Sequence, residues 1–222
     1  MNINFTDPNL ASLLNLLTTC GWRDMASDNM DALAERADCD FRCGASKGCF
    51  MHAHWDFVLK VPLYADEDIE DNYCEKEYEA YLNIVKNYPT CAHLFAPIEF
   101  LGWYGEMPVY VQDKVYRSFS DCHWSSDTQK WYDKLNNEAY TFVNKSETAE
   151  AKEMDTDYHY GVCRSRLCLA YFYFIFKIYG YAVCKNLMKW ITETEQDDLH
   201  EANIGITADF KPVIFDYSGF EG

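Results

Sequence analysis

Hydrophobic residues in the N-terminal part of the chain recur with the period of two helices. Asp7 and Pro8 are typical of a helix N-cap and first helical residue, and Gly21 is expected to end that helix. A second helix is predicted from Ser27 to Ala37. The inner faces are expected to carry Leu10, Leu13, Leu14 and Leu17 in the first helix and Met30, Leu33 and Ala34 in the second. We expect these helices to form an N-terminal helical extension, residues 1–38, that braces a smaller lobe or binds a partner.

Short β-like runs follow, with one helix between them. The run Trp55 to Pro62 places Lys60 among apolar neighbours, where an ammonium costs stability unless it meets an anion. The alternative is a lysine on an edge strand that points to water. A helix is predicted from about Asn72 to Asn87, and two strands are predicted at Leu94–Trp103 and Met107–Gln112. The inner face of this helix is expected to carry Tyr78, Tyr81, Leu82 and Val85.

A small-residue segment, Gly44-Ala45-Ser46-Lys47-Gly48, separates two of these runs. Glycine lets backbone N–H groups approach phosphate oxygens, so Gly44, Ser46, Lys47 and Gly48 are candidate phosphate-binding residues. An ordinary hairpin turn explains the same composition equally well.

The second half of the chain is mostly helical in pattern. Helices are predicted at Trp124–Phe142, Val162–Tyr179 and Tyr181–Ile191, with Gly180 between the last two. The charged stretch from Asn144 to Thr156 carries no core pattern and is expected to be a mobile loop.

The chain ends in a predicted hairpin. Ile204-Gly205-Ile206 and Val213-Ile214-Phe215 flank a polar turn, with Pro212 at a strand start, where its missing N–H is tolerated. Asn203 and Asp216 should therefore converge at the open end. An amide oxygen and a carboxylate suit Mg²⁺, which prefers hard ligands and usually keeps waters or substrate phosphates. Asp198, on the preceding loop, could then reach a substrate hydroxyl.

Two motifs in this region resemble the protein-kinase-like superfamily. The run from Asp198 to Asn203, DLHEAN, resembles the catalytic loop of aminoglycoside and choline phosphotransferases, and Asp216-Tyr217-Ser218 resembles the metal-binding DFG triplet. The resemblance implies Asp198 as the residue that orients or deprotonates the acceptor and Asn203 with Asp216 as metal ligands. It also implies that His200 faces the γ-phosphate.

The same resemblance assigns the earlier strands and helix. Lys60 would orient the α and β phosphates and pair with a glutamate of the following helix. Glu77 is preferred because Tyr81 follows one turn later, while Glu75 and Glu79 stay open as alternatives. Gln112 to Lys114 would form the hinge that meets adenine, with Gln112 and Lys114 as cofactor-binding residues.

The fold expected from the resemblance is α+β, a compact two-lobed kinase-like fold. Residues 39–112 would form the N-lobe and residues 113–222 a shortened, mostly helical C-lobe, since only six residues follow Asp216. The chain is similar in this respect to small kinase-like proteins of bacteria and their phages. A protein partner could complete such a lobe.

These expectations together predict an ATP- and Mg²⁺-dependent phosphotransferase that acts on an unknown hydroxyl acceptor, either a protein or a small molecule. One alternative is a nucleotide-binding pseudokinase that docks a partner. Another is an acidic interaction protein of phage type that inhibits a host protein by occupying its nucleic-acid site.

Composition and charge limit the kinds of partner that the protein is expected to bind. At 222 residues, with 49% hydrophobic and 17% aromatic residues, the chain can bury a sizeable core. Its net charge of −17 and pI near 4.6 disfavour direct binding to nucleic acid or to an anionic membrane. The longest apolar run, Leu167 to Phe176, is too short to cross a bilayer.

Ten cysteines fit reduced thiols in a cytoplasm, because no N-terminal stretch resembles a signal peptide. A zinc site is a further alternative, although the paired CxxC spacing of structural zinc sites is missing. Its candidate ligands are Cys39, Cys43, Cys49, His52 and His54.

Overall fold

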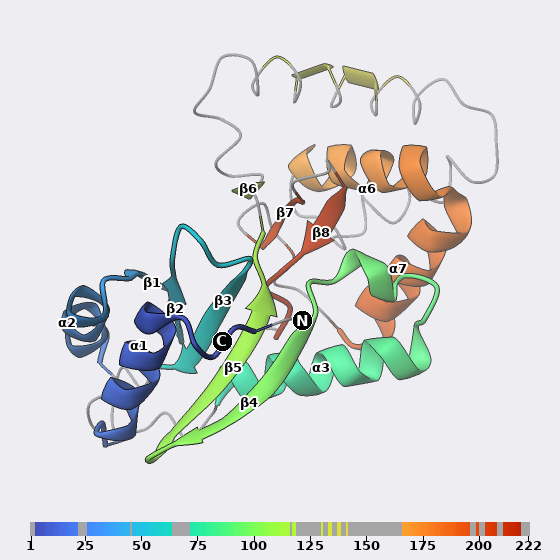
Figure 1. Cartoon of the computed structure of the whole chain (residues 1–222). Coiled ribbons are helices and arrows are strands. Elements are labelled where there is room, and N and C mark those ends of the chain that lie inside the picture. The colour runs from blue at the N-terminus through green and yellow to red at the C-terminus, as the bar shows by residue number, and fades with distance from the viewer. Residues whose placement is uncertain are drawn as a thin grey trace. The chain divides into compact units, whose positions relative to one another are not determined.

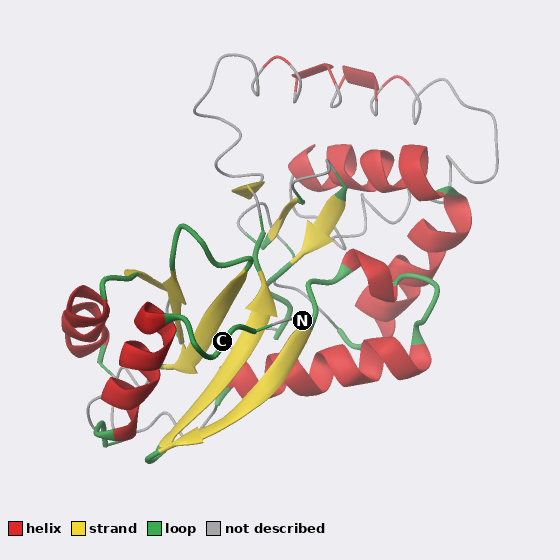
Figure 2. Cartoon of the chain, viewed as in Figure 1, coloured by secondary structure: helices red, strands yellow, loops and turns green. Residues whose placement is uncertain are grey.

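The computed structural model describes residues 3–21, 26–44, 46–63, 72–115, 117–118, 130, 133–134, 137–138, 141, 166–195, 199, 203–207 and 211–218. The predicted α+β class is confirmed: the chain contains both helices and strands, and five of the strands form an antiparallel sheet (Figures 1 and 2). The chain divides into two compact units. The first comprises Met1–Glu79 with Pro97–Lys114, and the second comprises Ala80–Ala96 with Val115–Gly222.

An antiparallel sheet is the centre of the first unit. Its strands stand in the order β1-β2-β3-β5-β4, so β3 is the middle strand and β4 is an edge. The strands span Asp40–Cys43 (β1), Lys47–Met51 (β2), Phe57–Pro62 (β3), Ile98–Tyr104 (β4) and Met107–Asp113 (β5). The fourth strand thus begins later than predicted, because residues Ala92–Leu94 form a 3-10 turn (η2) instead.

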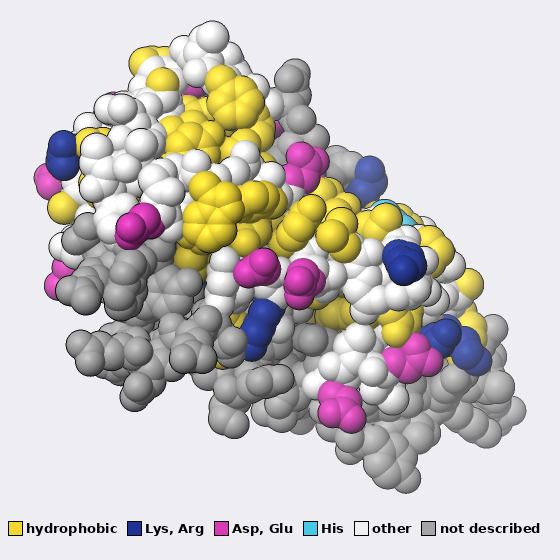
Figure 3. Space-filling model, turned by 90° about the horizontal axis from the view of Figure 1, so that it is seen from below, with side chains coloured by type: hydrophobic (Ala, Val, Ile, Leu, Met, Phe, Trp, Pro, Cys, Tyr) yellow, Lys and Arg dark blue, Asp and Glu magenta, His cyan; other side chains and the backbone are white. Residues whose placement is uncertain are grey.

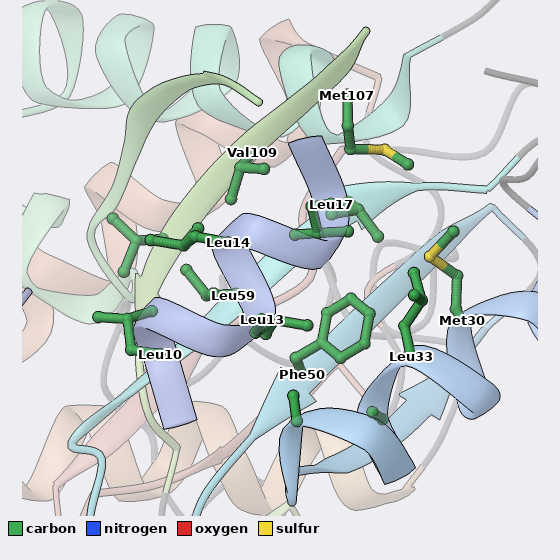
Figure 4. Close-up of a cluster of buried hydrophobic side chains, with 14 of the residues drawn as sticks. Leu10, Leu13, Leu14, Leu17, Met30, Leu33, Phe50, Leu59, Met107 and Val109 are labelled. Atoms are coloured by element: carbon green, nitrogen blue, oxygen red, sulfur yellow. The ribbon is translucent and has the colours of Figure 1, made fainter. Parts of the chain in front are cut away.

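Two N-terminal helices pack on one face of this sheet. Helix α1 spans Pro8–Thr18 and helix α2 spans Ser27–Ala37, as predicted, although α1 is capped by Thr19 and not by Gly21. Their predicted inner faces are buried and share one core with β2, β3 and β5 (Figure 4). The predicted extension is therefore part of the sheet unit, where it removes apolar surface of the sheet from water. The core includes Leu10, Leu13, Leu14, Leu17, Met30, Phe50, Leu59 and Val109.

The start of α1 is tied to the sheet through Asp7. Its carboxylate accepts a hydrogen bond from the Leu10 backbone N–H at 2.9 Å and another from the Trp55 indole at 3.2 Å. These two bonds, the Leu10 bond above all, lower the pKa of Asp7. The cap thereby joins the helix to the connection between β2 and β3.

Helix α3, Tyr73–Asn87, follows β3 and lies where it was predicted, but its buried face is different. Leu82 and Val85 are half exposed, at 49% and 47%, whereas Cys74, Glu77 and Ile84 are fully buried. The predicted inner face was wrong because it counted only apolar side chains, and the buried stripe of this helix contains a carboxylate.

The second unit contains two of the predicted helices. Helix α6 spans Arg166–Tyr179 and α7 spans Tyr181–Glu193, separated by Gly180 as expected. A small sheet in the order β6-β7-β8 joins Arg117–Ser118, Ile204–Ile206 and Pro212–Ile214. Helix α6 and η2 contact β8.

Some predicted features lie outside the described residues. These are most of the helix at residues 124–142 and all of the loop at residues 144–156. Within the described part of the chain, no helix is both long and apolar enough to cross a membrane.

Several large hydrophobic side chains reach the surface, and Figure 3 shows one face on which such side chains lie beside acidic ones. On the edge strand β4, Trp103 is 65% exposed and Phe100 is 39% exposed. Their rings lie 6.2 Å apart.

Candidate functional site

Lys60 lies at the middle of the sheet, on the face opposite α1 and α2. Its neighbours Leu59 and Val61 point into the core with those helices, so the alternation of the strand turns Lys60 toward α3. The ammonium donates to both Glu77 carboxylate oxygens, at 2.9 and 2.8 Å. Lys60 is 4% exposed and Glu77 is 0% exposed. The lysine is therefore buried in an ion pair and is not an edge residue facing water.

The structure selects one of the three candidate glutamates. Glu77 belongs to the buried stripe of α3, whereas Glu75 and Glu79 are exposed. The spacing of two residues on a helix explains this outcome, because positions i−2 and i+2 lie on the opposite side of the helix from position i.

Two further side chains hydrogen-bond to the same carboxylate. The Lys47 ammonium donates to Glu77 Oε2 at 3.2 Å, and the Gln112 amide donates to Oε1 at 2.9 Å. Both residues are buried. The roles predicted for them, in a phosphate loop and in a hinge, did not include this contact with Glu77. The signal in the sequence that could have indicated this contact was the alternation of side chains along β2 and β5, which has a period of two residues.

The thiol of Cys74 lies near this cluster. Burial raises the pKa of Cys74, while the Lys47 and Lys60 charges act in the opposite direction. Cys74 is fully buried at the start of α3. This thiol is therefore a packing residue without the lowered pKa that a nucleophile needs.

The predicted phosphate loop is a tight hairpin turn. The Gly44 N–H donates to the Lys47 carbonyl at 3.0 Å, and Lys47 and Gly48 already belong to β2. A Cβ at Gly48 would lie 2.6 Å from the ring of Phe41, so packing explains this glycine. Ser46 is buried, and its carbonyl accepts the Leu63 N–H at 2.9 Å. The expected loop is therefore shorter than predicted, and its second half is strand.

The predicted hinge residues make structural contacts with their side chains. The Lys114 ammonium donates to the carbonyl oxygens of His52 and Trp55, at 3.0 and 3.3 Å. Together with the Gln112 amide on Glu77, these bonds hold the end of β5 against the β2–β3 connection and α3. The backbone N–H groups of Asp113 and Lys114 also have partners, since they donate to the carbonyl oxygens of Pro97 and Asp56 at 3.1 and 2.9 Å.

The C-terminal hairpin brings the predicted metal ligands toward one another. Ile204 pairs with Ile214 and Ile206 pairs with Pro212, and the Phe215 N–H donates to the Asn203 carbonyl at 3.0 Å. The backbone of Asn203 thus lies opposite Phe215, next to Asp216, as the hairpin predicted. Asn203 is buried and Asp216 is half-buried. An amide and a carboxylate at this end are oxygen donors of the kind that Mg²⁺ takes.

Tyr217 fixes the chain just after Asp216. Its ring is 2% exposed and lies edge-on to Phe95, with centroids 5.2 Å apart, and Phe95 in turn packs against Trp190 of α7. The Tyr217 hydroxyl donates to the Ala96 carbonyl at 2.8 Å. The middle residue of the triplet is therefore an anchor, and only the resemblance to DFG had drawn attention to it.

Asp198 and His200 lie outside the described residues. Leu199, which separates them in the sequence, is buried.

The alternative zinc site is not supported by the described residues. Cys39, Cys43, Cys49, His52 and His54 are all described, and in this part of the chain no three His, Cys, Asp or Glu side chains group as metal ligands would. His52 and His54 instead form a T-shaped ring contact, with ring centroids 5.2 Å apart.

The described part of the chain thus defines an α+β protein with a buried lysine–glutamate pair on a five-stranded antiparallel sheet. No family model, curated protein or solved structure matches the chain.

Proposed function

We propose that the protein is an ATP- and Mg²⁺-dependent phosphotransferase with a two-lobed, kinase-like fold. The observation that carries the proposal is the buried pair of Lys60 and Glu77. A lysine on the third strand that pairs with a glutamate on the next helix is the arrangement with which protein kinases orient nucleotide phosphates.

The order of elements supports the same proposal. A hairpin precedes the lysine strand, the glutamate helix follows it, and two antiparallel strands complete the sheet. The hairpin that carries Asn203 and Asp216 comes after the helices of the second unit, as the motifs require. An aromatic residue buried directly after Asp216 also agrees with the DFG pattern.

In the proposed reaction, Lys60 would bind the α and β phosphates, and Asn203 with Asp216 would hold the divalent ion. That ion would neutralise phosphate charge. A bond forms between the acceptor hydroxyl oxygen and the γ-phosphorus, and the bond from that phosphorus to the ADP oxygen breaks. Asp198 orients the hydroxyl and accepts its proton, and His200 faces the γ-phosphate. Most of the rate enhancement would come from positioning and from charge stabilisation.

The first experiment measures binding. ATP with Mg²⁺ at 100 times its Kd should stabilise the protein by about 2.7 kcal/mol, a rise in Tm of about 5 °C or more. Chelation of Mg²⁺ with EDTA should reduce the shift. A complete absence of stabilisation by ATP and Mg²⁺ would refute the proposal.

The second experiment measures transfer, as ADP formation and as labelled phosphate from the γ position of ATP on any acceptor in the mixture. Asp216→Asn keeps the size of the side chain and should lower the rate on the order of 100-fold. Asp31→Asn makes the same charge change on the exposed surface of α2 and should leave the rate unchanged. If the protein binds ATP but turns none over, and Asp198→Asn changes neither result, the protein is a pseudokinase instead.

A further inference from the structure

The Glu77 carboxylate is shared by two lysines, one more than the proposed phosphate contact needs. Lys60 donates from β3 and Lys47 donates from β2, and both ammonium groups are buried with the carboxylate. The Gln112 amide of β5 completes the set.

The strand register explains how the second lysine reaches the carboxylate. Cys49 lies directly opposite Lys60, and Lys47 is two residues away from Cys49 on the same face of β2. The two lysines are therefore diagonal neighbours across the β2–β3 pair, a spacing that long side chains span. Glu77 lies within reach of both because α3 presents it to this face of the sheet.

The hydrogen bonds are distributed evenly over the two carboxylate oxygens. Oε1 accepts from Lys60 and Gln112, both at 2.9 Å, while Oε2 accepts from Lys60 at 2.8 Å and from Lys47 at 3.2 Å. If Lys60 moved away, each oxygen would keep one donor and the carboxylate would keep one ammonium. With Lys60 as its only cation, Glu77 would become a buried charge without a counter-ion, which is strongly destabilising.

We propose that Lys47 is a positioning residue that holds Glu77 and α3 in place while the Lys60 ammonium transfers to the phosphates of a bound nucleotide. The inference rests on the proposed function. When the oligophosphate draws Lys60 away from Glu77, Lys47 stays on that carboxylate. The oligophosphate and Glu77 therefore do not compete for a single cation.

The first test needs no nucleotide. Lys47→Met, Lys60→Met and the double variant are compared in the full chain by their urea unfolding midpoints. Each single variant should fold, because the other lysine and Gln112 remain on Glu77. The double variant should lose more than the sum of the two single losses. Additive losses would show that the lysines do not replace one another and would overturn the proposal.

The second test measures ATP affinity in the presence of Mg²⁺. Lys47→Met should weaken binding about tenfold, because Lys60 is then the one described lysine left on Glu77, and Lys47→Arg should restore it. In a Glu77→Gln background, Lys47→Met should change the affinity less than twofold. The affinity for adenosine, which has no phosphate, should be the same in all of these variants.

The outcomes separate this inference from the proposed function. No binding of ATP and Mg²⁺ by the wild-type protein would refute both. Wild-type binding with unchanged affinity in Lys47→Met would refute the positioning role alone. An equal loss of affinity from Lys47→Met in the wild-type and Glu77→Gln backgrounds would also refute it, since Lys47 would then contact the phosphates directly.

Discussion

Replacement of Gly105 by alanine should be among the most damaging small changes in the sheet unit. Gly105 begins the two-residue turn between β4 and β5, with φ at +64°, a conformation that costs an alanine roughly 1–2 kcal/mol. An added Cβ would also overlap the Thr18 carbonyl oxygen and would lie 3.0 Å from the carbonyl carbon. These are backbone atoms at the end of α1, so the helix must shift, at a cost of about 1–3 kcal/mol. The sum is about 2–5 kcal/mol.

Two other glycines provide controls for this prediction. A Cβ at Gly102, where φ is +142°, would meet no described atom within 4 Å, so Gly102→Ala tests backbone strain without overlap. Gly44→Ala should be close to neutral, because there a Cβ also meets no described atom within 4 Å. Urea unfolding followed by circular dichroism ranks the three variants. If Gly105→Ala costs no more than the roughly 1–2 kcal/mol of backbone strain alone, α1 does not pack its end against this turn.

Three further predictions concern single groups. Tyr217→Phe removes the hydroxyl that donates to the Ala96 carbonyl and should lower the free energy of unfolding by about 1 kcal/mol. If Asp216 binds metal, the phosphotransfer rate should also fall several-fold. Unchanged stability in urea would contradict the anchoring role of Tyr217. The pKa of Asp7 is below its ordinary value of 3.8 in the folded state, so its stabilising effect is present above about pH 3.8 and is lost as the pH falls through the folded-state pKa. Asp7→Asn should therefore flatten the loss of stability on acidification, as measured by Tm between about pH 5 and pH 2.5. The exposed Cys43 should react with iodoacetamide at about pH 8 while the buried Cys74 stays unmodified until the protein unfolds, and mass spectrometry of the alkylated peptides would reveal the opposite order if this reasoning is wrong.

Local sequence patterns predicted most of the individual elements. The apolar period of α1 and α2, the capping role of Asp7 and the position of Pro212 at the start of β8 all depend on residues close together in the chain. The hairpin also predicted that the backbone of Asn203 lies next to Asp216, because pairing follows directly from a short turn.

The composition of the lysine–glutamate cluster could not be predicted in the same way. Its hydrogen bonds join residues 17, 30 and 35 positions apart, on two neighbouring strands, a third strand and a helix. The sequence indicated that Lys60 needs an anion and left three glutamates open, of which the resemblance favoured Glu77. The burial of one face of α3 decided for Glu77.

Among the described residues, the sequence by itself thus determined most of the helices and strands and the C-terminal hairpin, since hydrophobic period and turn chemistry act over a few residues. The tertiary structure alone decided that Lys47 and Gln112 join Glu77 and that Leu82 and Val85 are exposed. The physical reason is that a buried carboxylate must have its charge and hydrogen bonds satisfied by whichever donors the sheet register brings to it.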